Sequence, residues 1–198
     1  TRRSSDLDNI VFMGMGEPMM NLAAIRKAVA ILCHKDGRRL SARRITLSTS
    51  GVVPGIYDLA DNDPSLRLAV SLTTADATLR QELMPVAKSY SLEELRQAIS
   101  YYIKKTGQRV TLEAALLGGK NTGKQSAERL VSFAKGLDVY INLIPWNPVA
   151  SLPFAEPSAV ECRKFMQWLE QAGLTVSLRT RRGRTIGGAC GQLGRTTH

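Results

Sequence analysis

The most informative part of this chain is Ile10-Val11-Phe12-Met13-Gly14-Met15-Gly16-Glu17-Pro18. Its first four residues form an apolar run that predicts a buried strand, and Pro18 stops that strand from continuing. The glycines that follow let a ligand approach the backbone closely. Ligand sites of parallel α/β folds lie beyond the carboxyl ends of the strands. Glu17 is therefore either a site carboxylate or a solvated residue of a tight turn.

The rest of the chain repeats a strand-then-helix pattern. With the first strand at residues 9–13, further strands are expected at 44–48, 66–72, 109–117, 139–144 and 174–178. Amphipathic helices are expected at residues 22–34, 55–61, 79–84, 92–105, 126–135 and 159–172. Capping boxes at Ser91 and Ser158 mark two helix starts, and Gly107 and Gly173 fit helix ends. This alternation predicts an α/β fold with parallel strands. Six strands indicate a partial (β/α) barrel, because a complete one typically needs about 250 residues.

Composition narrows the partners and the compartment. The chain has 198 residues, of which 27 are Lys or Arg and 17 are Asp or Glu, so its net charge is +10. This excess of positive charge favours a polyanionic partner such as nucleic acid. No apolar run approaches the roughly 20 residues that span a bilayer, and no signal peptide opens the chain, so no membrane partner is expected. The three cysteines are too few and too scattered for a disulfide framework or a metal pattern. They indicate a cytoplasmic protein.

Polar residues follow the later strands as well. In a parallel barrel these segments converge on one mouth. Together they offer one carboxylate, several hydroxyls and an amide, which suit a zwitterionic or polyhydroxyl ligand better than a bare phosphate. Any single hydroxyl turn is more often a local turn or helix cap. The segments are Ser48-Thr49-Ser50-Gly51, Ser71-Leu72-Thr73-Thr74, Gly118-Gly119-Lys120-Asn121 and Pro145-Trp146-Asn147-Pro148.

The C-terminal segment places one thiol beside several arginines. Arg179, Arg181, Arg182 and Arg184 precede a glycine-flanked loop that carries Cys190. Guanidinium groups favour the thiolate, so a reactive cysteine is expected here rather than a structural one. Cys33 and Cys162 lie in helical patterns and are expected to be packing residues.

Four of these stretches, in order and with matching spacing, resemble the RlmN/Cfr radical S-adenosylmethionine RNA methyltransferases. The likeness runs through nearly the whole chain, and jointly the motifs are highly specific. They are Asn9-Ile-Val-Phe-Met-Gly-Met-Gly-Glu-Pro18, Thr46-Leu-Ser-Thr-Ser-Gly-Val-Val-Pro54, Asn142-Leu-Ile-Pro-Trp-Asn-Pro148 and Ala189-Cys-Gly-Gln-Leu193.

The resemblance implies a radical SAM type of barrel and a set of site residues. Cys190 matches the cysteine that accepts a methyl group from one S-adenosylmethionine, and a radical generated from a second one then carries that carbon to an adenine ring carbon. The implied substrate is 23S ribosomal RNA and, in some members, transfer RNA. The implied cofactor-binding positions are Gly16, Glu17, Ser48, Ser71, Leu72, Thr73 and Asn147, with Gly16 and Glu17 holding the amino group of S-adenosylmethionine.

Two departures from the family pattern stand out. The family's Cys-x-x-x-Cys-x-x-Cys motif, which holds a [4Fe–4S] cluster, has no match here, so its ligands are not expected in this chain. The sequence is read as a C-terminal portion that does not turn over alone, with an electron donor serving the complete enzyme. Thr73 also replaces the family's usual His, and Thr185 and Gly188 alter the segment before Cys190. We expect a barrel over residues 1–184 and a Gly-rich segment over 185–198.

Two alternatives remain open at the level of sequence. One is a non-catalytic RNA-binding paralogue that keeps the barrel scaffold. The other is a barrel enzyme with Cys190 as nucleophile, which lacks a plausible histidine base. If the chain is part of an RNA methyltransferase, the candidate phosphate contacts are Arg38, Arg39, Arg43, Arg44, Arg181, Arg182 and Arg184. The sequence indicates no oligomeric state.

Overall fold

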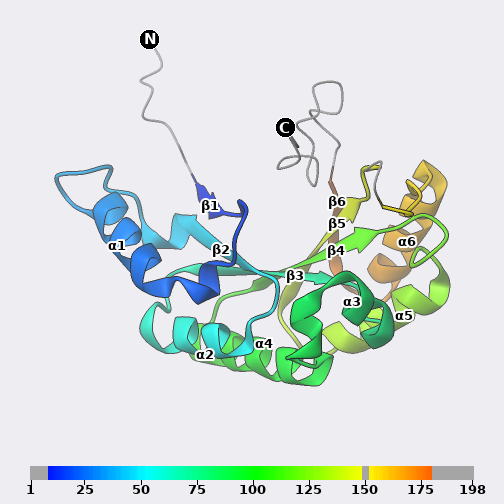
Figure 1. Ribbon diagram of the computed structural model, residues 1–198, viewed down its shortest axis with the longest axis horizontal. Coiled ribbons are helices and arrows are strands. Elements are labelled where there is room, and N and C mark those ends of the chain that lie inside the picture. Colours follow the sequence, from blue (N-terminus) through cyan, green and yellow to red (C-terminus); the bar gives the residue numbers. More distant parts are fainter. Residues whose placement is uncertain (1–8, 149–151, 180–198) are drawn as a thin grey trace, which may run out of the picture. The chain divides into compact units, whose positions relative to one another are not determined.

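The computed structural model describes residues 9–148 and 152–179, and strands and helices alternate along them (Figure 1). The strands are β1 (Ile10–Phe12), β2 (Ile45–Thr49), β3 (Arg67–Thr73), β4 (Val110–Leu116), β5 (Val139–Pro145) and β6 (Thr175–Leu178). The α-helices are α1 (Leu22–Cys33), α2 (Val53–Asn62), α3 (Ala77–Leu83), α4 (Leu92–Thr106), α5 (Lys124–Ala134) and α6 (Ala159–Gln171). Short 3-10 helices form at η1 (Pro18–Met20), η2 (Ala42–Arg44) and η3 (Pro85–Lys88).

The six strands form one sheet whose strand order follows the chain order. β1 pairs with β2, β2 with β3 and β5 with β6, all in parallel. This arrangement confirms the predicted α/β fold with parallel strands. Because the strands are parallel, the residues that follow β1 and β2 leave the sheet at the same edge.

The chain divides into two compact units. The first comprises Thr1–Ser71 and Met84–Thr111, and the second Leu72–Leu83 and Leu112–His198. In the first unit α2 and α4 lie side by side (Figure 1). Their contact buries aliphatic side chains completely, among them Ile56, Leu59, Leu95 and Ile99.

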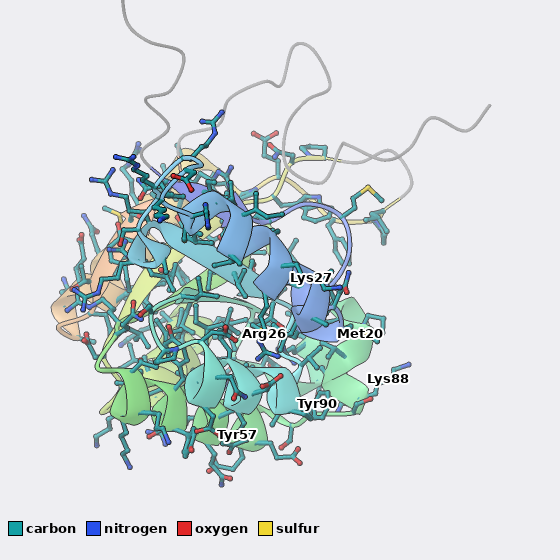
Figure 2. All side chains as sticks on the ribbon, turned by 90° about the vertical axis from the view of Figure 1, so that its left-hand side faces the viewer. Met20, Arg26, Lys27, Tyr57, Lys88 and Tyr90 are labelled. Atoms are coloured by element: carbon teal, nitrogen blue, oxygen red, sulfur yellow. The ribbon has the colours of Figure 1, made fainter. Side chains whose placement is uncertain are left out.

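Arg26 links two helices of the first unit. It reaches from α1 to Asp58 of α2 and to Asp63 just beyond that helix, with a nitrogen–oxygen distance of 2.8 Å to each carboxylate. Figure 2 shows Arg26 between α1 and α2, in contrast to the exposed Lys27 next to it. The two carboxylates raise the pKa of Arg26, and the guanidinium lowers the pKa of Asp58. This ion-pair cluster fixes α1, and with it the loop that follows β1.

The second unit is built in the same manner from β4, β5, β6 and their helices. β4 and β5 alternate strictly between buried and half-buried residues, as expected for strands with one face on the core. Helix α6 packs on α5 and β6 through Phe165 and Leu169, both buried.

The helix boundaries follow the predicted signals closely. Both capping boxes are present, since the Ser91 and Ser158 hydroxyls accept from the N–H groups of Glu94 and Glu161, whose carboxylates accept in return. Gly107 ends α4 in the left-handed conformation (φ 66°), as predicted. Helix α2 starts at Val53, earlier than expected, because Pro54 fits its first turn.

The prediction that the first strand is buried is wrong. Val11 is 56% exposed and Met13 42% exposed. β1 stands at the end of the strand order and has β2 as its neighbour in the described sheet. An apolar run indicates a strand well, but it does not indicate how many neighbours that strand has.

Candidate functional site

Glu17 joins the ends of two parallel strands. Its backbone continues from β1, and its side chain caps η1 by accepting from the Met19 N–H at 3.1 Å on Oε1. The other carboxylate oxygen, Oε2, accepts from the backbone N–H of Ser50 at 2.8 Å and from its hydroxyl at 2.6 Å. Ser50 directly follows β2. The carboxylate is thus an ordered group at the carboxyl edge of the sheet rather than a solvated turn residue.

A pocket of about 440 Å³ surrounds this turn. Its lining includes Gly14, Gly16 and Glu17 from the loop after β1, and Asn21 and Ala24 from the α1 region. Gly16 adopts φ +107°, a conformation that side-chain-bearing residues rarely take, so glycine is required there. The volume lies within the range of about 300–1,000 Å³ that small-molecule sites occupy. Gly16 and Glu17, the two predicted cofactor-binding residues of this loop, therefore line the same pocket.

Close packing fixes the position of this loop. Met19 of η1 is buried against α2, where a Cβ added to Gly55 would lie 2.4 Å from the Met19 Cβ. Only glycine allows the two backbones to approach this far. The loop after β1 is therefore fixed from two sides, by Ser50 and by α2.

Ser48 and Ser71 are the other predicted residues of the first unit. Ser48 lies in β2 and is buried, and Ser71 is half-buried near the end of β3. Between Ser48 and Ser50, the Thr49 hydroxyl accepts from the N–H groups of Gly51 and Val52 at 3.1 and 3.2 Å. In this turn the Thr49 hydroxyl therefore binds neighbouring backbone N–H groups, and the Ser50 hydroxyl donates to Glu17.

The end of β3 has an unusual backbone. Leu72 is fully buried, so a ligand at this strand end meets its main chain rather than its side chain. Thr73 has φ +64°, and the Thr74 N–H donates to the Leu72 carbonyl at 2.7 Å. This pattern is a γ-turn of the rare, strained kind with positive φ. A β-branched residue with positive φ is a genuine outlier, and such outliers gather at functional sites.

Asn147, the remaining predicted residue in the described part, follows β5 and is buried. Its neighbour Trp146 is fixed by two contacts: its backbone N–H donates to the Leu116 carbonyl at 2.9 Å, and its ring packs edge-on against Phe154. Asn121, in contrast, is a structural residue. Its Oδ1 accepts from the Leu117 N–H and its Nδ2 donates to the Ala115 carbonyl, both at 2.7 Å.

Cys190, the predicted reactive cysteine, lies outside the described residues, as do Arg181, Arg182 and Arg184. Cys162 is buried in α6, and burial raises the pKa of its thiol, which confirms it as a packing residue. Cys33 is only half-buried. Within residues 9–148 and 152–179, no three His, Cys, Asp or Glu side chains gather in a way that could hold a metal ion.

The predicted phosphate contacts of the first unit lie around η2. Arg38, Arg39, Arg43 and Arg44 are all exposed. Because η2 directly precedes β2, Arg43 and Arg44 stand at the amino end of that strand, whereas Ser48 and Ser50 stand at its carboxyl end. A polyanion held by these arginines would bind away from the Glu17 pocket.

A second pocket, of about 690 Å³, lies in the second unit and contains none of the predicted site residues. It is lined by the last residues of β5 and β6, Pro145 and Leu178, and by the first turn of α6. Separately, none of the described helices combines the length and the apolar character needed to cross a bilayer.

Comparison with curated proteins gives a consistent set of relatives, although no family model matches the chain. The chain is 60% identical over 195 residues to a probable dual-specificity RNA methyltransferase RlmN of Treponema denticola. The aligned residues make up 98% of this chain and 56% of that protein. A protein of the same name from Thermus thermophilus is 43% identical over 188 residues, 95% of this chain and 53% of that protein. The chain therefore spans about half the length of the curated relatives it matches.

Solved structures agree with these relatives. A radical SAM methyltransferase from Sphaerobacter thermophilus superposes with a TM-score of 0.90 at 43% identity, over 94% of this chain and 55% of that one. A domain of a pyruvate-formate lyase-activating enzyme from Bacteroides vulgatus shares the fold at 17% identity, with a TM-score of 0.64 over 87% of this chain and 99% of that domain. The predicted partial barrel of the radical SAM type is thereby confirmed. Through nearly its whole length, the chain is homologous to about half of an RlmN-type radical SAM methyltransferase.

Proposed function

We propose that the protein containing this chain methylates an adenine ring carbon of RNA by radical S-adenosylmethionine chemistry. We further propose 23S ribosomal RNA as its substrate, with transfer RNA as a second one, and Cys190 as the residue that carries the methyl group. The observation that supports the proposal most strongly is the 60% identity over 195 residues to a protein named as an RNA methyltransferase. The 0.90 TM-score to a radical SAM methyltransferase supports the type of chemistry.

The residues around the Glu17 pocket fit S-adenosylmethionine. The cofactor carries an ammonium group, and a fixed carboxylate accepts a strong charge-assisted hydrogen bond from such a cation. An ionised carboxylate has about four acceptor positions, and the bonds from Met19 and Ser50 use three of them. Gly16 lets the cofactor approach the backbone beside it. In this proposal Ser48, Ser71, Leu72, Thr73 and Asn147 make the remaining contacts.

The described residues do not fit a [4Fe–4S] cluster. Such a cluster needs cysteine thiolates, but Cys162 is buried in α6 and Cys33 lies at the end of α1 in the other unit. In the proposal, other parts of the complete protein hold the cluster, an electron donor reduces it, and this chain by itself does not turn over. In the proposal this chain binds and orients the cofactor, carries the methyl-accepting Cys190 and contacts the RNA backbone.

RNA is expected to bind through its phosphates and to present one unstacked adenine to the site. The exposed arginines Arg38, Arg39, Arg43 and Arg44 are the described candidates for phosphate contacts. They lie at the other end of β2 from Ser50. The proposal therefore separates two tasks: the edge that carries Glu17 binds the cofactor, and the segment around η2 binds the RNA backbone.

Equilibrium binding of S-adenosylmethionine to the complete protein tests the cofactor assignment. We expect saturable binding with one class of site in this chain, weakened by Glu17→Ala and unchanged by Glu170→Ala, an exposed carboxylate on α6. Binding that is absent, or that both variants weaken equally, would contradict the assignment. RNA binding without any cofactor binding would support the non-catalytic RNA-binding alternative.

A further inference from the structure

Arg80 is a buried arginine that is not among the predicted site residues. It lies in α3, only 1% of its surface is exposed, and burial lowers the pKa of its guanidinium. A buried guanidinium remains charged, and burying a charge costs free energy unless hydrogen bonds compensate. One of its bonds runs from Nε to the Leu72 carbonyl over 3.0 Å. The side chain therefore points at the last residues of β3.

The carbonyl that Arg80 binds is also the one that closes the γ-turn. The Leu72 oxygen accepts from Arg80 Nε at 3.0 Å and from the Thr74 N–H at 2.7 Å. Between them lies Thr73, whose φ of +64° is unfavourable for a β-branched residue. Such a conformation persists only where its surroundings enforce it. Arg80 is a charged group in direct contact with this turn.

Helix α3 gives Arg80 a fixed base. Asp76, just before the helix, accepts from the Leu79 N–H at 3.0 Å, and its own N–H donates to the Thr74 hydroxyl at 3.2 Å. The Asp76 carboxylate also forms an ion pair with Arg129 of α5. All of these residues belong to the second unit, and their contacts connect with one another. The helix that carries Arg80 is therefore tied to the end of β3, whose Leu72 carbonyl Arg80 binds.

We propose that Arg80 is a positioning residue, which holds the Leu72 carbonyl so that the main chain of residues 71–73 keeps the shape that binds S-adenosylmethionine. This inference rests on the proposed cofactor-binding role of that segment. It assigns the shape of the strand end to a buried guanidinium rather than to the side chain at position 73. Arg80 itself does not touch the cofactor in this proposal.

The test uses the complete protein with Arg80→Met, which keeps the length and removes the charge and the donors. We expect S-adenosylmethionine affinity to fall about tenfold, the order of the roughly 10–100-fold that loss of an orienting outer partner costs at metal sites. Amide hydrogen exchange at Thr74 should accelerate, because its acceptor is released. The control is Arg163→Met, which removes an exposed arginine on α6 of the same unit and should leave both readouts unchanged.

A second variant separates positioning from general stability. Thr73→Gly removes the steric cost of positive φ, so in the Arg80→Met background it should recover part of the lost affinity. In the wild-type background, where Arg80 already holds the turn, it should bring no such gain in affinity. Equal effects of Thr73→Gly in both backgrounds, or unchanged affinity and Thr74 exchange in a folded Arg80→Met protein, would overturn the inference. If wild-type protein itself binds no S-adenosylmethionine, the proposed function fails instead.

Discussion

Glu17 and Ser50 lie 33 residues apart in sequence and share two hydrogen bonds, from the Ser50 N–H at 2.8 Å and from its hydroxyl at 2.6 Å to the same carboxylate oxygen. The pair connects the carboxyl ends of β1 and β2, which are parallel neighbours. It orients the carboxylate before any ligand arrives. Orientation in advance is what a binding site for an ammonium group requires.

Ser50→Ala removes the shorter of these two bonds and keeps the backbone one. We expect the free energy of unfolding to fall by about 1 kcal/mol, the usual net value of one hydrogen bond. We also expect S-adenosylmethionine to bind several-fold more weakly, because Glu17 becomes less fixed. Denaturant unfolding and equilibrium binding of the complete protein measure the two effects. A Ser50→Ala protein with unchanged cofactor affinity would show that this orientation does not matter for binding.

Glu17→Gln has a mixed effect that the structure explains. The amide group of glutamine must face either the Met19 N–H or the donors of Ser50, and two donors then oppose each other. We expect a loss of about 1–3 kcal/mol in stability, as for other polar groups left unsatisfied, as well as weaker cofactor binding. Stability measured beside affinity therefore decides how much of the affinity loss belongs to Glu17 itself. A destabilised variant with wild-type affinity would reassign Glu17 to a structural role.

Glu161 predicts how the stability of the second unit depends on pH. Its carboxylate accepts from Ser158 and Thr122, and these hydrogen bonds lower its pKa from 4.5 to about 2. A lowered folded-state pKa adds stability above the unfolded value, and that stability is lost as pH falls from about 4.5 towards 2. We expect Glu161→Gln to have a lower thermal midpoint than wild type at pH 7. This difference in thermal midpoint should shrink as the pH falls from about 4.5 towards 2.

Thermal scans at pH 7, 5 and 3 would measure that gap. Glu170→Gln is the matched control, since Glu170 is an exposed residue on the same helix. Its midpoint should follow wild type at each pH. A Glu161→Gln gap that stays constant from pH 7 to pH 3 would contradict the assigned hydrogen-bond network.

The arginines around η2 predict a salt-dependent contribution to RNA affinity. Each phosphate contact adds about 0.7–0.9 to the slope of log affinity against log salt concentration. The double variant Arg38→Gln/Arg43→Gln should therefore lower that slope by up to about 2 and leave S-adenosylmethionine affinity unchanged. A charge-matched control is Lys88→Gln/Lys104→Gln; both lysines are exposed, and Figure 2 labels Lys88. Equal slopes for the two double variants would exclude a specific RNA contact at η2.

Cys190 is expected to be the most reactive thiol of the chain. In the native protein a mild alkylating reagent should modify it about tenfold or more faster than Cys162, since a neighbouring positive charge favours the thiolate. Cys162 is buried in α6 and should be protected, and the half-buried Cys33 should react at an intermediate rate. Peptide mass spectrometry after timed labelling gives the three rates. Similar rates for Cys190 and Cys162 would remove the case for a special thiol.

Local signals made much of the fold predictable from the sequence. The capping boxes at Ser91 and Ser158 and the helix end at Gly107 depend on neighbouring residues only, so the sequence contains them in full. The order of the elements follows from hydrophobic periodicity. The exposure of β1 was not predictable, because an apolar run looks alike in a central strand and in a strand at the end of a sheet.

The candidate site was predictable only in part. The placement of Gly16 and Glu17 followed from the strand-end rule for parallel folds, and they do share a pocket. The partner of Glu17 was missed because Ser50 stood among several equivalent hydroxyls, and tertiary packing chose between them. Arg80 gave no signal, since arginines are almost never fully buried unless paired. The positive φ of Thr73 runs against the preference of its residue type.

The proposed function requires that the protein containing this chain places a methyl carbon on a ring carbon of adenine. The most direct test incubates the complete, cluster-reconstituted protein anaerobically with a reductant, ribosomal RNA and S-adenosylmethionine labelled in its methyl group, and analyses the nucleosides by mass spectrometry. We expect label on a ring carbon of adenine, and its loss in Cys190→Ala. Label on an exocyclic nitrogen or a ribose hydroxyl, or no labelled nucleoside from a protein that binds the cofactor, would contradict the proposed function.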